Sequence, residues 1–185
     1  MRIGDATVGS IAESLEGVRS VVHPNRVVTS ITHDSRQVGP GTLFVAIVGE
    51  RSDGHEFVDA AIAAGATAIL AERPMGTTIG EIVVDDSRGA MAWAARALHG
   101  APDTAMSMVG VTGTNGKTTV AHLCEAIWRC DDRSVGLVGT LGARIDGEPV
   151  HLKRTTPEAT DLQALLASMR DKGVDTVVME VSSHA

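Results

Sequence analysis

Aromatic residues are scarce in this chain of 185 residues, which has two tryptophans, two phenylalanines and no tyrosine. Proteins that bind single-stranded nucleic acid stack the bases on aromatic side chains, and such platforms are nearly absent here. The formal net charge is −7 at pH 7, and lysine and arginine form no basic stripe. We therefore expect no nucleic-acid partner, and any anionic ligand has to be bound by local features of the chain.

Cysteines and long apolar runs are also rare. Cys124 and Cys130 are the only cysteines, and their spacing on a helix gives neither a disulfide framework nor a metal-ligand pattern. The uncharged run Thr104 to Gly116 is too short and too rich in glycine to span a membrane, and Met1 to Asp5 do not open a signal peptide. The sequence thus predicts a reduced, cytoplasmic protein without a membrane partner, and it leaves the oligomeric state open.

A glycine-rich segment between a predicted strand and a predicted helix is the most informative feature that is present. It comprises Gly113, Thr114, Asn115, Gly116, Lys117, Thr118 and Thr119. Such a turn binds phosphate with its backbone N–H groups and the helix dipole, with Lys117 placed to reach the outer phosphates and the Thr118 hydroxyl to bind Mg²⁺. The generic phosphate-loop pattern has a glycine where this chain has Val111, so the match is imperfect. The strand–turn–helix context still predicts a loop that binds a nucleoside triphosphate.

Apolar periodicity divides the chain into two halves, with Ala101 to Asp103 as the linker. In residues 1–100 we predict strands at Val27–Thr32, Leu43–Val48, Ala68–Ala71 and Ile82–Val84, and helices at Glu56–Ala64 and from a Ser87 cap through Leu98. In residues 101–185 we predict strands at Met106–Thr112, Val135–Val138 and Thr176–Val181, and helices at Thr118–Cys130 and Asp161–Lys172. This alternation implies right-handed crossovers and a parallel sheet.

The fold class that follows is α/β. We expect a small mixed-sheet N-terminal domain over residues 1–100, followed over residues 101–185 by the start of a mostly parallel, doubly wound phosphate-loop ATPase domain. A parallel sheet of so few strands is not expected to form a complete domain, so the sequence is predicted to be cut short after Ala185.

Glu180 is a candidate magnesium ligand because it lies near the end of an apolar strand. In a parallel sheet that end faces the phosphate loop, and a carboxylate there can bind Mg²⁺ directly or through water. Without the loop, the same residue would be read as a strand-end carboxylate facing solvent. The loop makes the magnesium role the better hypothesis.

Three further polar segments follow or precede predicted elements. Thr155-Thr156-Pro157, after Lys153 and Arg154, is either a helix entrance or a hydroxyl pair with free N–H groups that binds an anion. Asp34-Ser35-Arg36 and the loop from Gly49 to Gly54 are ordinary turns when each is taken alone. Because both follow strands, they could together bind one ligand.

These motifs resemble those of the Mur ligase family. The similar segments are Gly113 to Thr119, Asp34 to Arg36 with Leu43 to Ala46, Thr155 to Pro157 and Met179 to His184. The resemblance covers the whole chain and implies an enzyme of three domains, which bind the UDP-sugar, ATP and the incoming amino acid. Residues 1–100 then correspond to the UDP-sugar domain, and residues 101–185 to the first part of the ATP domain.

The resemblance also implies an activity. The family uses ATP and Mg²⁺ to convert a carboxylate into an acyl phosphate, from which an amine then displaces phosphate. The implied substrates are UDP-N-acetylmuramoyl-L-alanyl-D-glutamate and a diamino acid, in peptidoglycan precursor synthesis. Diaminopimelate is the favoured diamino acid and L-lysine the alternative, since the selecting residues are expected beyond Ala185. The 185-residue chain alone is expected to be inactive.

The family's functional residues map onto positions of this sequence. By resemblance, Lys117 and Glu180 are catalytic, Thr118 and Glu180 bind the metal, and residues 113–119 bind the nucleotide. The implied substrate-binding residues are His33, Ser35, Glu50, Arg51, Ser52, Arg154, Thr155, Thr156 and Ser182.

Other nucleotide-dependent functions stay in competition with the ligase. A GTPase is disfavoured because no Asp-x-x-Gly follows the loop and no Asn-Lys-x-Asp occurs. Folate polyglutamation enzymes have a similar loop, but the domain that carries Asp34 to Arg36 argues against them. A non-catalytic nucleotide-binding module is the remaining alternative.

Overall fold

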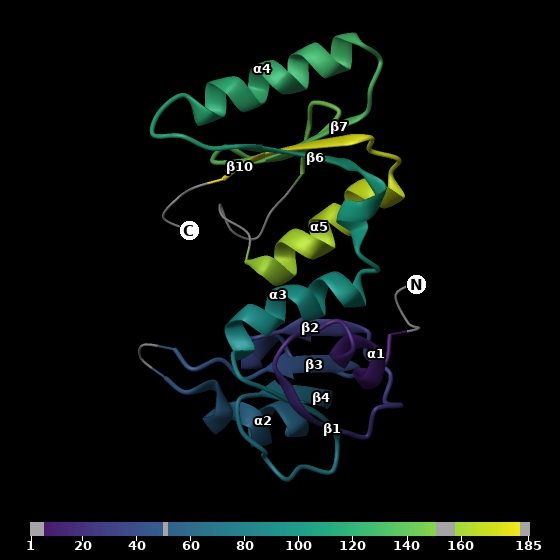
Figure 1. Ribbon diagram of the computed structural model, residues 1–185, viewed down its shortest axis with the longest axis vertical. Coiled ribbons are helices and arrows are strands. Elements are labelled where there is room, and N and C mark those ends of the chain that lie inside the picture. The colour runs from purple at the N-terminus through teal and green to yellow at the C-terminus, as the bar shows by residue number, and fades with distance from the viewer. Residues whose placement is uncertain (1–5, 50–51, 151–157, 182–185) are drawn as a thin grey trace. The chain divides into compact units, whose positions relative to one another are not determined.

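The computed structural model describes residues 6–49, 52–150 and 158–181. The chain divides into two compact units, Met1–Gly100 and Ala101–Ala185, which are treated separately below (Figure 1). Among the helices of the described residues, none combines the length and the apolar character needed to cross a bilayer.

The first unit is built on a mixed, five-stranded sheet. Its elements, with η for a 3-10 helix, are α1 (Val8–Ala12), β1 (Val18–Val22), β2 (Ser30–Thr32), η1 (Ser35–Gln37), β3 (Thr42–Val45), η2 (Gly54–Phe57), α2 (Val58–Ala63), β4 (Ala66–Ala71), β5 (Gly80–Val84) and α3 (Ser87–Leu98). The strand order is β1-β5-β4-β3-β2, with β1 antiparallel to β5 and the other neighbours parallel. The predicted α/β class and mixed sheet are confirmed.

The central strands of this sheet are covered on both faces. Nearly every residue of β3, β4 and β5 is buried, as expected for parallel strands between helices. Helix α2 packs Val58 and Ala61 against Phe44 and Ile69 on one face. Helices α1 and α3 contact the sheet from the other face (Figure 1).

The first unit differs from the sequence prediction in several places. Strand β2 begins at Ser30 and not at Val27, and β3 ends at Val45 and not at Val48. Asp86, and not Ser87, caps α3, because the Asp86 carboxylate accepts hydrogen bonds from the N–H groups of Arg88 and Gly89. Helix α1 and strand β1 were not predicted. Helix α1 has only five residues, and most of β1 is exposed, so neither shows a clear apolar period.

A buried histidine in the segment after β3 is hydrogen-bonded to the residue that follows β4. The ring of His55 is fully buried, and its Nε2 accepts a hydrogen bond from the backbone N–H of Glu72. The ring proton is therefore on Nδ1, which donates to the Asp53 carboxylate. Arg73 donates to the same carboxylate at 3.0 Å. The backbone N–H and ring of His55, with Arg73, hold the pKa of Asp53 well below its usual value.

The second unit contains two layers of helix around another five-stranded sheet. Its elements are η3 (Pro102–Ala105), β6 (Ser107–Val111), α4 (Lys117–Cys130), β7 (Val135–Gly139), β8 (Gly142–Ile145), β9 (Glu148–Val150), α5 (Ala159–Asp171) and β10 (Thr176–Glu180). The strand order is β6-β10-β7-β8-β9, with β10 parallel to both of its neighbours. The predicted parallel strands are present, and the antiparallel hairpin β8–β9 is an addition that was not predicted.

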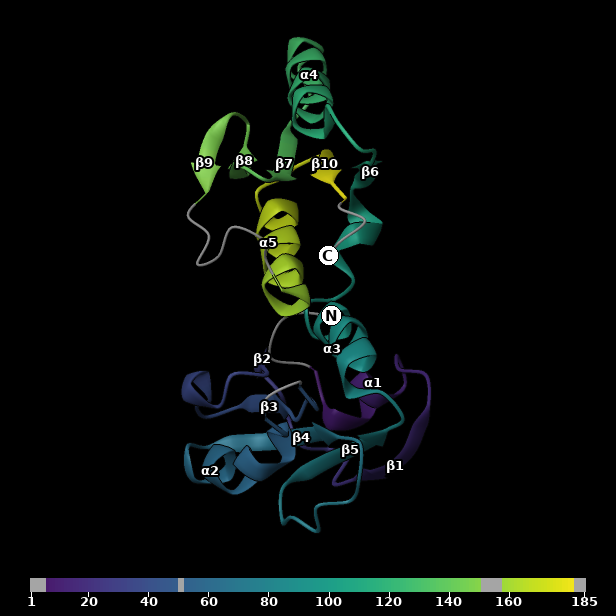
Figure 2. The same ribbon diagram turned by 90° about the vertical axis from the view of Figure 1, so that its left-hand side faces the viewer.

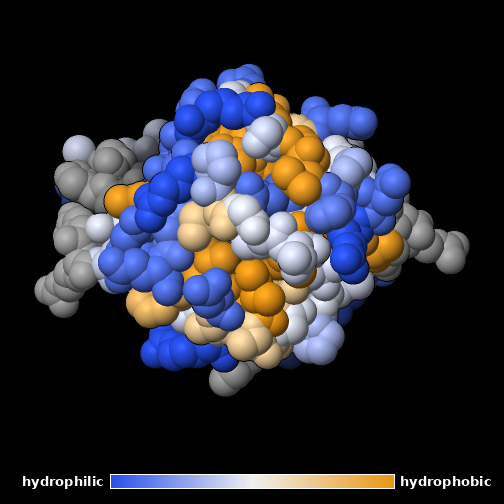
Figure 3. Space-filling model, turned by 90° about the horizontal axis from the view of Figure 1, so that it is seen from below, coloured by the Kyte–Doolittle hydropathy of each residue, from blue (hydrophilic) through white to orange (hydrophobic). Residues whose placement is uncertain are grey.

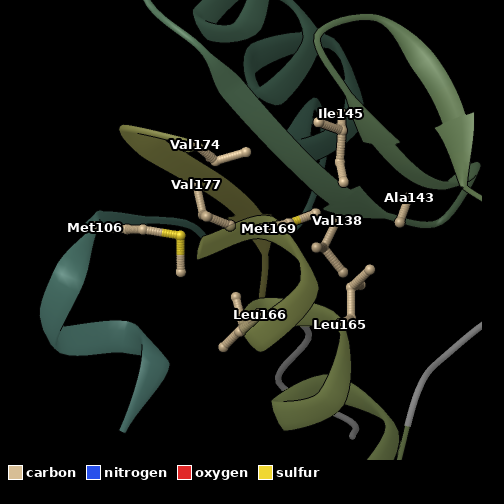
Figure 4. Close-up of a cluster of buried hydrophobic side chains, with 9 residues drawn as sticks. All are labelled: Met106, Val138, Ala143, Ile145, Leu165, Leu166, Met169, Val174 and Val177. Carbon is tan, nitrogen blue, oxygen red and sulfur yellow. The ribbon is translucent and has the colours of Figure 1, made fainter. Parts of the chain in front are cut away.

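Helices α4 and α5 cover opposite faces of this sheet (Figure 2). Helix α5 packs Leu165, Leu166 and Met169 onto the sheet (Figure 4), as its helical spacing predicts. Helix α4 packs Ala121 onto Val135, Leu137 and Val178 on the other side. The unit is thus doubly wound, with its core in two layers.

On the face drawn in Figure 3, hydrophobic residues form small groups between hydrophilic ones. Scattered apolar side chains of this kind are normal on a soluble domain.

Gly136 on β7 provides a test of the packing between the sheet and α5. A Cβ at this position would lie 2.6 Å from Met169 Sδ and 3.3 Å from Val177 Cγ2, inside a filled core. We expect Gly136→Ala to lower the free energy of unfolding by about 1–3 kcal/mol, because overpacking forces buried side chains off their rotamers. Gly110→Ala on β6 is the matched control, since among the described residues a Cβ there meets only Val181 Cγ2, at an ordinary contact distance of 3.4 Å. Equal losses for the two variants in urea unfolding would contradict this packing.

The Asp53 carboxylate provides a test by pH. Because its pKa is lowered in the folded state, its stabilising contribution is present above the unfolded pKa of about 3.9 and is lost as the pH falls further. Asp53→Asn should therefore flatten the fall in unfolding free energy of the chain between about pH 5 and pH 2. Asp59→Asn, an exposed substitution in the first turn of α2, is the control and should keep the wild-type slope. Parallel curves for Asp53→Asn and wild type would show that the carboxylate is not engaged as described.

Candidate functional site

The glycine-rich loop connects β6 to α4, as predicted. Gly113 and Gly116 have φ angles of +144° and +79°, which residues with a Cβ rarely adopt. Gly116 is the N-cap of α4 and offers no side chain to the first N–H groups of the helix. Those groups, with the positive end of the helix dipole, are suited to bind an anion.

Lys117, the first residue of α4, folds back over the loop. Its ammonium group donates a hydrogen bond of 2.7 Å to the carbonyl of Gly113. Residues 112–116 of the loop are exposed, and Thr119 is exposed on the first turn of the helix. The lysine charge therefore lies at the open side of the loop, where an anionic ligand would meet it.

Glu180 lies beside this loop because β10 pairs with β6. In the parallel register, Glu180 is opposite Val111, the last residue of β6. Its carboxylate accepts a hydrogen bond of 3.0 Å from the Thr118 hydroxyl through Oε2. The structure thus brings together two residues that the sequence analysis named for the same metal.

Thr118 and Glu180 form a set of oxygen atoms that fits Mg²⁺. A hydroxyl and a carboxylate are the hard ligands this ion prefers, and Mg²⁺ at nucleotide sites is usually completed by phosphate oxygens and water. The described residues contain no group of three or more histidine, cysteine and acidic side chains that could bind a metal by themselves. The pair therefore suits a metal that is shared with a bound nucleotide.

Thr140 belongs to this site and was missed by the sequence analysis. It follows β7, and both its backbone N–H and its hydroxyl donate to the Glu180 carboxylate, at 3.2 and 3.1 Å. The preceding Gly139 makes room, because a Cβ there would overlap the same carboxylate. The signal was available: Gly139 and Thr140 follow a predicted strand, which is the rule that singled out Glu180.

Two candidate segments of the first unit follow neighbouring parallel strands. His33, Asp34 and Ser35 follow β2, and Ser52 lies in the loop after β3. The carboxyl ends of parallel strands lie at the same edge of a sheet, which is the edge where α/β proteins bind ligands. Ser52 is exposed, and Ser35 and His33 are half-buried.

Arg36 binds the carboxylate of Asp34 in this segment. Its Nε and one terminal nitrogen donate to the two carboxylate oxygens, each at 2.9 Å. This bidentate pair is the main reason why the pKa of Asp34 lies well below its usual value. Asp34 also accepts from the backbone N–H of Arg36, so it fixes the turn that presents Ser35.

Several predicted site residues lie outside the described residues. They are Glu50, Arg51, Arg154, Thr155, Thr156 and Ser182. Their assignment to substrate binding stays a prediction.

Comparison with protein families gives matches over most of the chain. Residues 27–99 match the model described as "Mur ligase family, catalytic domain", and residues 111–185 match "Mur ligase middle domain". Among curated proteins, a UDP-N-acetylmuramoyl-L-alanyl-D-glutamate–2,6-diaminopimelate ligase of Streptomyces avermitilis is 49% identical over 178 residues, covering 92% of this chain and 35% of the relative. The ligase of the same name from Lactiplantibacillus plantarum is 49% identical over 158 residues, covering 85% and 32%. The chain thus spans about a third of the length of the curated relatives it matches.

Solved structures of the same group share the fold. One, of a UDP-N-acetylmuramoyl-L-alanyl-D-glutamate–2,6-diaminopimelate ligase, aligns with 100% of this chain and 37% of its own, with a TM-score of 0.77 and 29% identity. The MurF ligase of Thermotoga maritima, solved in complex with ADP, aligns with 84% of this chain and 32% of its own, with a TM-score of 0.56 and 28% identity. These matches, with the loop after β6 and the acidic end of β10, show that the chain belongs to the Mur ligase family.

Proposed function

We propose that this chain is part of an ATP-dependent ligase that adds diaminopimelate to UDP-N-acetylmuramoyl-L-alanyl-D-glutamate in peptidoglycan precursor synthesis. Residues 1–100 would bind the UDP end of the substrate, and residues 101–185 would form the first part of the ATP-binding domain. The names of the relatives at 49% identity support this activity. Such an enzyme works in the cytoplasm, where its nucleotide substrates are.

One observation carries the proposal: the parallel pairing of β6 with β10 brings the start of α4, with Lys117 and Thr118, next to Glu180. Transfer of a phosphoryl group requires charge neutralisation and alignment more than covalent help from the protein. In this arrangement the free N–H groups of α4 would bind the phosphates, and Lys117 would leave the Gly113 carbonyl to contact their outer oxygens. ADP in the MurF structure supports nucleotide binding by this fold.

Thr118 and Glu180 would hold Mg²⁺ in the same site. The bound ion would offset negative charge on the phosphates while the D-glutamate carboxylate attacks. The carboxylate forms a bond to the γ-phosphorus, the bond to the ADP oxygen breaks, and an acyl phosphate results. An amine of the diamino acid then displaces inorganic phosphate from the acyl carbon and loses a proton, which leaves the amide.

The UDP-sugar half of the proposal rests on the first unit. His33, Ser35 and Ser52 lie on or next to the loops that follow β2 and β3, and hydroxyl and imidazole groups can bind the polar atoms of a nucleotide sugar. Glu50, Arg51, Arg154, Thr155, Thr156 and Ser182 are proposed to complete this site. The choice of diaminopimelate over L-lysine is tested by tripeptide synthesis with a polypeptide of the relatives' full length.

Lys117→Ala tests the phosphate loop. Loss of a charged hydrogen-bond donor to the phosphates should weaken ATP binding by about 10- to 100-fold, while the thermal melting temperature stays near that of the wild type. The loss should be larger for ATP than for ADP, because Lys117 is placed to reach the outer phosphates. Lys172→Ala at the end of α5 is the matched control, and both affinities are measured in Mg²⁺ buffer. Unchanged ATP affinity in Lys117→Ala would refute the assignment of the loop.

A titration with UDP-N-acetylmuramoyl-L-alanyl-D-glutamate tests the first unit. We expect the amide resonances of Ser35 and Ser52 to shift in the ¹⁵N-labelled chain, because both lie at the strand ends where the UDP moiety would bind. Resonances of residues in β1, at the far side of the strand order, serve as the internal control. A folded chain that shows no shift at either serine would contradict the substrate role of residues 1–100.

A further inference from the structure

The Glu180 carboxylate is oriented from two sides. The Thr118 hydroxyl, on α4, donates to Oε2 at 3.0 Å. The backbone N–H and the hydroxyl of Thr140, after β7, donate to Oε1 and Oε2 at 3.2 and 3.1 Å. A carboxylate at the end of a flexible side chain otherwise samples several rotamers, and fixing one of them costs conformational entropy.

Gly139 shows that this arrangement requires space beside β7. A Cβ on Gly139 would lie well inside contact distance of Glu180 Oε1 and Cδ. The side chain of Glu180 therefore lies directly across the end of β7, where Thr140 follows. The turn after β7 is shaped to receive this carboxylate.

We propose that Thr140 is a positioning residue that holds the Glu180 carboxylate in the orientation needed to bind Mg²⁺. This inference rests on the proposed function. If Thr118 and Glu180 both ligate a cation, the Thr118 hydroxyl and Glu180 Oε2 turn to the metal. The hydrogen bond between these two oxygens is then lost. The two hydrogen bonds from Thr140 then remain to hold the carboxylate, so Thr140 acts on the metal site through Glu180.

Thr140 is exposed, and its hydroxyl bonds only to Glu180 among the described residues. Thr140→Val removes the hydroxyl with little change in shape and keeps the backbone N–H. The fold should therefore survive the substitution. Thr140→Ser restores a hydroxyl at the same place and serves as the rescue variant.

The experiment measures binding of a fluorescent ATP analogue to the 185-residue chain as a function of Mg²⁺ concentration. Thr140→Val should raise the Mg²⁺ concentration for half-maximal binding by about 3- to 10-fold, the effect of losing one solvent-exposed hydrogen bond. Affinity for the analogue in EDTA should stay within about twofold of the wild type. Thr140→Ser should return close to the wild-type Mg²⁺ dependence.

Thr104→Val is the matched control in the same unit. Thr104 is exposed, and its hydroxyl donates to the carbonyl of Ala101 at 2.8 Å. It lies before the start of β6, whereas Glu180 lies at the other end of the paired strands. It should leave both binding curves unchanged. Gly139→Ala provides a second route to the same carboxylate and should raise the Mg²⁺ requirement at least as much as Thr140→Val.

The outcomes separate this inference from the proposed function. If the wild type binds the analogue and Thr140→Val shows the same Mg²⁺ dependence, the role of Thr140 is overturned and the nucleotide site stays intact. If Thr140→Val weakens binding of the analogue equally in EDTA and in Mg²⁺, the role of Thr140 is also overturned, because a general structural defect would then explain the data. Absence of ATP binding by the wild type, at any Mg²⁺ concentration, would overturn the proposed function and this inference with it.

Discussion

The parallel pairing of β10 between β6 and β7 is the constraint on which the candidate site depends. The register sets Glu180 beside Val111 and Met179 beside Val138, so three strands end at one edge of the sheet. This pairing alone brings together the loop into α4, the turn at Thr140 and the carboxylate of Glu180. A shift of one residue in β10 would turn Glu180 to the other face of the sheet and separate it from Thr118.

Strand β7 accommodates both the core and the site by means of two glycines. Gly136 gives Met169 of α5 its place in the core, and Gly139 gives the Glu180 carboxylate its place at the strand end. The same strand thus binds a helix on one face and shapes a polar site at its end. Its sequence, Val135 to Gly139, is apolar throughout because the strand is buried on both faces.

Most of the strongly apolar strands and long helices could be predicted from the sequence to within two residues at each end, because burial on both faces leaves a continuous apolar run. Strand β3 is an exception, since it ends at Val45 and not at the predicted Val48. Helix α1, strand β1 and the hairpin β8–β9 could not be read from periodicity, since β9 is only three residues long and mostly exposed. The hairpin did carry a local signal in the sequence, which is the Asp146-Gly147 pair typical of a type I′ turn. Both residues have the positive φ that such a turn requires. Glu180 could be predicted from its place at a strand end, and the same rule points to Thr140, whose link to Glu180 is shown by its hydrogen bonds.

The hairpin β8–β9 has a consequence for how this sheet can grow. On its side the outermost strand is β9, which is short and contains Pro149, a residue without a backbone N–H. On the opposite side, β6 offers a longer backbone that pairs with β10 alone among the described strands. Lateral growth of the sheet, by a strand of the same polypeptide or of a second molecule, is therefore directional and favours the side of β6.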